Sequence, residues 1–117
     1  MVRVVDVGQE VLDNVGLVGF ERFKYRLFIR QLITLWKRGR VTFRVRSPPK
    51  RVLDELENEG IAYKVYRDEE KGRVTLWIKV KDEETLMRVY ACVHSCSIVK
   101  LREIVKMLKR YEEIHVV

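Results

Sequence analysis

The chain has 117 residues and a formal net charge of +7, with 47% hydrophobic and 35% charged residues. This size and composition predict one folded domain spanning 1–117 around a single hydrophobic core, and they exclude a disordered chain. No apolar run approaches the roughly 18 to 20 residues of a membrane span, and the sequence shows neither a secretory signal nor a disulfide framework, so we expect a cytoplasmic protein with no membrane partner.

The first expected elements lead into a strongly basic stretch. A β-branched strand is predicted at 2–7, and a helix at 20–38, where apolar residues recur at helical spacing and Gly39 supplies a stop. Apolar and polar residues alternate over 41–47, which predicts a strand. Residues 20–51 hold eleven Lys or Arg residues against the single acid Glu21. This concentration of positive charge favours a polyanionic partner such as nucleic acid.

Helices and strands follow one another in the rest of the chain. Ser47 is expected to cap a helix at 48–59 whose first residues are prolines. Two alternating strands, at 61–67 and 73–80, are joined by a turn at Gly72. Acidic residues open a helix at 82–93, a further helix covers 97–112, and residues 114–117 close the chain as a short strand.

The order of these elements predicts the fold class. From residue 41 onward it is strand, helix, strand, strand, helix, helix. We therefore expect an α+β fold with a ferredoxin-like split βαβ core, in which the helices at 48–59 and 82–93 cover one face of the sheet. The strands at 2–7 and 114–117 would add to this sheet. The helices at 20–38 and 97–112 are additions to the core.

Strict alternation divides the strand residues between two faces of the sheet. The face toward the helices would bury Val41, Phe43, Val45, Ile61, Tyr63, Val65, Val74, Leu76, Ile78 and Val80. The other face would present Thr42, Arg44, Arg46, Lys64, Tyr66, Arg73, Thr75, Trp77 and Lys79. Rings that stack on bases, together with cations that follow phosphates, are what single-strand binding needs. The predicted nucleic-acid contacts on this face are Arg44, Arg46, Lys64, Tyr66, Arg73, Trp77 and Lys79.

Three arrangements of this second face stay open. It is exposed and binds nucleic acid, or it is covered by the helices at 20–38 and 97–112, or it is covered by a second copy in a homodimer. The helix at 20–38 adds a cationic flank formed by Arg22, Arg26, Arg30 and Lys37. These four residues are predicted to contact phosphates, with a simple solvated helix face as the alternative.

Two further groups of residues are candidate metal sites. Cys92, His94, Cys96 and His115 have the residue types of a zinc site but not the spacing of a standard zinc finger, so no metal or other cofactor is expected. The acidic groups 68–70 and 82–84 raise a metal-dependent nuclease as a third reading. Neither a phosphate-binding glycine loop nor a nucleophile motif is present, which favours binding over catalysis.

The leading hypothesis is a small basic α+β module that binds RNA or DNA, preferably single-stranded, through phosphate contacts and aromatic stacking. The alternative is a protein-interaction or homodimerisation domain without catalytic activity. Residues 71–78 lack the aromatic signature of RNA-recognition motifs, so the chain is not assigned to that family.

Overall fold

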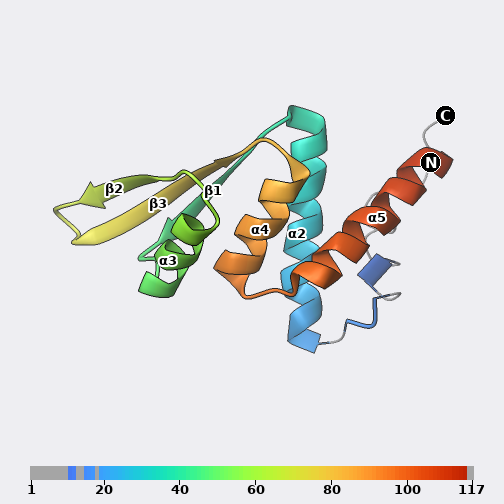
Figure 1. Ribbon diagram of the computed structural model, residues 1–117, viewed down its shortest axis with the longest axis horizontal. Helices are drawn as coiled ribbons and strands as arrows, with labels where there is room; N and C mark the ends of the chain where they lie inside the picture. Colours follow the sequence, from blue (N-terminus) through green and yellow to red (C-terminus); the bar gives the residue numbers. More distant parts are fainter. Residues whose placement is uncertain (1–10, 13–14, 18, 116–117) are drawn as a thin grey trace.

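The computed structural model describes residues 11–12, 15–17 and 19–115, and this part of the chain has an α+β architecture (Figure 1). Its elements are α2 (Gly19–Arg38), β1 (Val41–Arg46), α3 (Lys50–Asn58), β2 (Lys64–Asp68), β3 (Arg73–Val80), α4 (Glu83–His94) and α5 (Ile98–His115). Each corresponds to a predicted element, with ends shifted by at most a few residues. None of the helices in these ranges is long and apolar enough to cross a membrane.

The sheet has the strand order β1-β3-β2, and both neighbouring pairs are antiparallel. β1 and β2 therefore run in the same direction with β3 between them. The predicted strand at 2–7 lies outside the described residues. The predicted strand at 114–117 is wrong at its start, because residues 114 and 115 continue α5, and residues 116–117 lie outside the described part. The described chain is thus α+β with a three-stranded antiparallel sheet.

The start of α3 differs from the prediction. Ser47 does not cap the helix; its backbone is left-handed, with φ of 48°. The N-cap is Pro49, which is extended and makes no side-chain capping hydrogen bond, so the helix begins at Lys50. Proline disfavours helical geometry in the residue before it, and the Ser47-Pro48-Pro49 sequence imposes this restriction twice. The helix consequently starts two residues later than expected.

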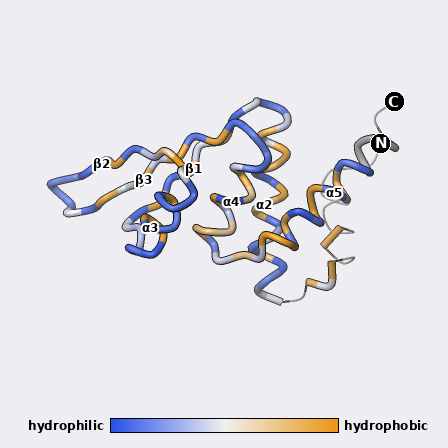
Figure 2. The backbone as a smooth tube through the Cα atoms, in the orientation of Figure 1, coloured by the Kyte–Doolittle hydropathy of each residue, from blue (hydrophilic) through white to orange (hydrophobic). Residues whose placement is uncertain are grey.

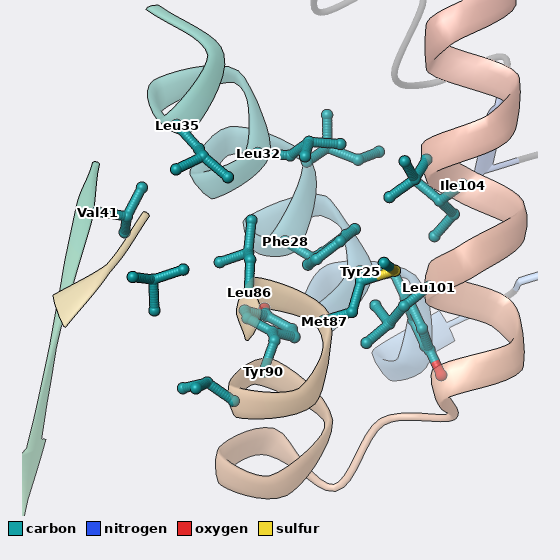
Figure 3. Close-up of a cluster of buried hydrophobic side chains, with 14 of the residues drawn as sticks. Tyr25, Phe28, Leu32, Leu35, Val41, Leu86, Met87, Tyr90, Leu101 and Ile104 are labelled. Carbon is teal, nitrogen blue, oxygen red and sulfur yellow. The ribbon is translucent and has the colours of Figure 1, made fainter. Parts of the chain in front are cut away.

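The hydrophobic core lies mainly between α2, α4 and α5 (Figure 3). Tyr90 of α4 is almost fully buried and meets the ring of Phe28 edge-on, with 5.3 Å between centroids. Its hydroxyl donates a hydrogen bond to the backbone carbonyl of Lys24 on α2. In the same region, the backbone N–H of Ser97 donates to the hydroxyl of Tyr25. Aromatic packing and satisfied hydroxyls together hold α2 against α4 and the start of α5.

One face of the sheet packs on this core. Its fully or nearly buried residues are Val41, Phe43, Leu76, Ile78 and Val80, as predicted. Phe43 reaches Tyr90 of α4, with 6.3 Å between ring centroids. Val65 was expected to be buried here but is 47% exposed. The β2–β3 hairpin extends beyond the helices at its outer end, where hydrophilic residues predominate (Figures 1 and 2).

The other face of the sheet is not covered by helices in the described part of the chain. α2 and α5 bury their apolar residues against α4 and against each other, and the main contact of α2 with the sheet is with β1 at its edge. The arrangement in which these two helices cover Trp77 and Tyr66 is therefore wrong. Tyr66 is 52% exposed, whereas Trp77 is partly buried by its neighbours on the sheet.

Candidate nucleic-acid interface

The strand register places the predicted contact residues in rows across the uncovered face. Arg44 of β1 and Lys64 of β2 both lie opposite Trp77 of the central strand β3. The next row contains Arg46, Thr75 and Tyr66, and a third pairs Thr42 with Lys79. Residues directly opposite each other in antiparallel strands project from the same face. All seven predicted sheet residues therefore share one surface, although they come from three separate segments.

Aromatic and cationic groups are in contact at the centre of this surface. The guanidinium carbon of Arg44 lies 4.3 Å from the centroid of the Trp77 ring. The Tyr66 ring lies on the neighbouring strand, 5.2 Å from Trp77 between centroids and tilted by 57°. A guanidinium that packs over an aromatic ring can still donate hydrogen bonds from its N–H groups to an anion. The three side chains thus combine a stacking platform with an anion donor.

The cations of this face are not neutralised by acids of the described chain. No ion pair joins Arg44, Arg46, Lys64, Arg73 or Lys79 to any acid that the structure describes. One acid, Asp68, shares the face opposite Arg73, and its carboxylate accepts the backbone N–H of Lys71 in the hairpin turn. The positive charge of the sheet face is therefore largely uncompensated.

The helical side of the molecule shows the opposite pattern. The carboxylate of Glu84 accepts two hydrogen bonds from Arg102, at 2.9 and 2.6 Å, which holds the pKa of Glu84 below its usual value. Lys109 pairs with Glu83 at 2.8 Å, and Arg51 pairs with Glu55 at 3.0 Å. Several cations on the helices are thus matched by acids of the described chain, whereas those of the sheet face are not.

The predicted cationic flank of α2 borders a hollow at the edge of the sheet. The flank of α2 that meets the sheet carries Gln31 and Thr34, which line a hollow with Thr42 at the edge of β1. Successive helix residues are about 100° apart, so Arg30 and Lys37 lie about 40° and 60° from Thr34 around the helix, although neither lines the hollow. Both are exposed, whereas Arg22 and Arg26 each take part in an interaction with another residue.

Two other arginines also lie beside the sheet. Arg38 and Arg40 line the same open hollow of about 800 Å³ next to Thr42. Both flank Gly39, whose φ of 75° turns the chain from α2 into β1. Sequence reasoning had counted them in the basic stretch but not among the contacts. Their position on either side of the turn that enters β1 was the signal that could have identified them.

The candidate metal-binding residues around Cys92 are not arranged as a metal site in the described part of the chain. Cys92 is buried and points to the backbone carbonyl of Val52 on α3, with sulfur 3.7 Å away, while His94 stacks on Tyr90. Burial raises the pKa of the Cys92 thiol to about 12 and lowers the pKa of His94. No group of three or more His, Cys, Asp or Glu side chains among the described residues is arranged to hold a metal ion. The side chain of His115 lies outside that description.

The two acidic groups are separated by the length of β3. Residues 68–70 lie at its first end and 82–84 just beyond its last, which is roughly 24 Å for eight strand residues. Asp82 caps α4 by accepting the backbone N–H of Thr85, and Glu83 accepts the indole N–H of Trp36. A two-metal centre requires its ions about 3.5–4 Å apart, so these groups do not form one.

Comparisons of the chain with protein families, with characterised proteins and with solved structures found no match.

Proposed function

We propose that this protein binds single-stranded nucleic acid on the uncovered face of its sheet. The observation that carries the proposal is the contact of Arg44 with Trp77 beside Tyr66, at the centre of a face whose other cations have no acid partner among the described residues. The rings would stack on unpaired bases, and the cations would contact phosphates.

A single strand suits this surface better than a duplex. Stacking on Trp77 or Tyr66 requires a base whose face is free, which a paired helix does not offer. Side chains on one face of a strand repeat about every 6.8 Å, so the face of β3 from Arg73 to Lys79 spans on the order of 20 Å. This length accommodates several nucleotides of an extended strand. We also propose a ferredoxin-like organisation for this sheet, which the order and directions of β1, β3 and β2 support.

The unmatched cations predict a defined salt dependence. Each phosphate contact to a single strand contributes a slope of about −0.7 in the logarithm of affinity against the logarithm of salt concentration. Five contacts from the sheet face therefore predict a slope near −3.5, or about a hundredfold loss of affinity between ~50 and ~200 mM salt. Removing one contacting cation should make the slope shallower by about 0.7.

The test is a fluorescence anisotropy titration of labelled single-stranded and duplex RNA and DNA at several salt concentrations. Arg44→Ala should weaken single-strand binding and reduce the slope. The matched control is Arg110→Ala, which removes an exposed arginine at the far end of α5, remote from the sheet (Figure 1). This control should leave the slope of sheet-face binding nearly unchanged.

Three results would overturn the proposal. The first is an absence of binding at about 50 mM salt, where phosphate contacts are strong. The second is equal or tighter binding of duplexes, which would remove the role of the rings. The third is an equal effect of Arg44→Ala and Arg110→Ala, which would show that binding depends only on the net charge of the protein.

A further inference from the structure

Strand β2 forms an outer edge of the sheet, and no other strand of the described residues pairs with its free side. The order β1-β3-β2 leaves one side of β2 without a neighbouring strand, and all five of its residues are exposed (Figure 1). Alternate N–H and C=O groups of an edge strand point outward, where another strand can accept and donate hydrogen bonds. β1 differs, because α2 packs beside it.

The sequence of β2 is complementary to itself when two copies run antiparallel. A two-fold axis perpendicular to the sheet keeps the uncovered faces of both copies on the same side. That restricts the pairing to registers that differ by two residues, because successive side chains alternate between faces. Only the register centred on Tyr66 aligns all five residues of Lys64–Asp68 with all five of the second copy. Shifting it by two residues in either direction leaves three pairs within the strand.

In this register the side chains match in chemistry. Lys64 lies opposite Asp68 of the second copy, and the symmetry makes this pair twice. Tyr66 lies opposite Tyr66 of the second copy, an aromatic pair across the axis. On the other face, Arg67 of the second copy lies opposite Val65, whose 47% exposed side chain its aliphatic stem would cover. Every pair is therefore favourable or neutral, although the edge carries two cations.

We infer that β2 pairs with β2 of a second copy of this chain, joining the two sheets edge to edge across Tyr66. The dimer forms without nucleic acid and does not depend on the proposed function. It leaves the uncovered faces open and brings their aromatic residues into one diagonal band, Trp77 and Tyr66 of one copy followed by Tyr66 and Trp77 of the other. A single strand long enough to reach both halves would then bind more tightly than a short one, because its second contact is intramolecular.

The test measures association of the protein alone by sedimentation equilibrium. A five-residue edge gives a small interface, so the mean mass should rise from 14.0 kDa toward twice that value only as the protein is concentrated from ~10 µM toward ~1 mM. Lys64→Glu places two acids opposite each other in both symmetric pairs, and Asp68→Lys does the same with two cations. Each single change should lower the association constant at least about tenfold. The combined charge swap restores opposite pairs and should restore association.

Matched controls are Lys106→Glu and Glu103→Lys, which make the same charge changes at exposed positions of α5. Both should leave association unchanged. The Asp68→Lys variants lose the hydrogen bond to the N–H of Lys71, so circular dichroism must show a native sheet before association is compared. The double variant also lacks this hydrogen bond. If its association is nevertheless restored, the pairing of residue 64 with residue 68 of the second copy is responsible.

Cysteine cross-linking reads the register directly. In a Cys96→Ser background, Tyr66→Cys places two thiols opposite each other across the axis, and oxidation should give a disulfide-linked dimer. Val65→Cys places them on the diagonal, about 7–8 Å apart, and should cross-link much less. A mass of 14.0 kDa at every concentration, no rescue by the double swap, or equal cross-linking at both positions would each overturn the inference. Single-strand binding by a protein that stays at 14.0 kDa at every concentration would overturn the inference while leaving the proposed function intact.

Discussion

The replacement of Trp77 by alanine tests whether this ring belongs to a binding surface or to the hydrophobic core. In the structure this ring loses two contacts on substitution, one with the guanidinium of Arg44 and one with Tyr66. An exposed cation–π contact contributes about 0.5–1 kcal/mol, and an aromatic pair about 0.5–1.5 kcal/mol. The free energy of unfolding should therefore fall by about 1–2.5 kcal/mol. A stacked base is worth about 1–3 kcal/mol, so single-strand affinity should fall roughly 5- to 150-fold.

Two control variants calibrate these effects. Leu76→Ala changes the preceding residue of β3, which points to the core and is fully buried, and should cost about 2–5 kcal/mol in urea unfolding. Phe23→Ala removes a ring of α2 that is 62% exposed and should change neither stability nor single-strand affinity appreciably. The reasoning fails if Trp77→Ala destabilises the protein as much as Leu76→Ala. It fails equally if Trp77→Ala and Phe23→Ala have the same effect on affinity.

Three further variants or measurements test the packing and the local electrostatics. Phe28→Ala removes a fully buried ring and should lower the free energy of unfolding by about 3–5 kcal/mol in urea. Asp82→Ala removes the cap of α4 and should cost about 0.5–2 kcal/mol at neutral pH. Hydrogen bonds from Thr85 lower the pKa of Asp82, so this contribution is present above the unfolded pKa and is lost as pH falls through the lowered folded pKa. Burial raises the thiol pKa of Cys92, to about 12, and of Cys96, so labelling with a disulfide reagent at pH 8 should be slow until urea unfolds the chain.

Each of these predictions has a result that contradicts it. Phe28→Ala with near-normal stability would show that the rings of α2 and α4 do not form the core. A stability difference between Asp82→Ala and the parent protein that persists in acid would show that the carboxylate is not the stabilising group. Rapid labelling of Cys92 in the native protein would show that α3 does not cover it.

Local sequence signals predicted most of the elements because the residues that define them are neighbours in the chain. Alternation over 73–80 gave the bounds of β3, and Gly39, with φ of 75°, ends α2 where expected. The errors have local causes too. No glycine or proline follows Arg110, so α5 continues to His115 and replaces a predicted strand. The N–H of Ile61 bonds to the carbonyl of Leu56 at the end of α3, so β2 begins later than residue 61.

For the candidate site, the sequence predicted only which residues share a face within each strand. Alternation placed Arg44 and Trp77 on the uncovered face of their own strands, and the structure agrees. The row that joins Arg44, Trp77 and Lys64 depends on the pairing of β1 and β2 with β3, which no short-range pattern specifies. The proximity of Arg38 to Thr42 likewise depends on how α2 meets the edge of the sheet.

The sequence by itself determined which residues share a face of each strand and helix, because the periods of two and 3.6 residues are properties of the local backbone. Only the tertiary structure decided that the face with Trp77 is uncovered. That outcome depends on where α2 and α5 bury their apolar residues. Two surfaces were available to them, the apolar face of α4 and the aromatic residues of the sheet. The cations beside Trp77 give the physical reason for the choice, because burying Arg44 and Arg46 beneath a helix would desolvate charges that no acid of the described chain neutralises.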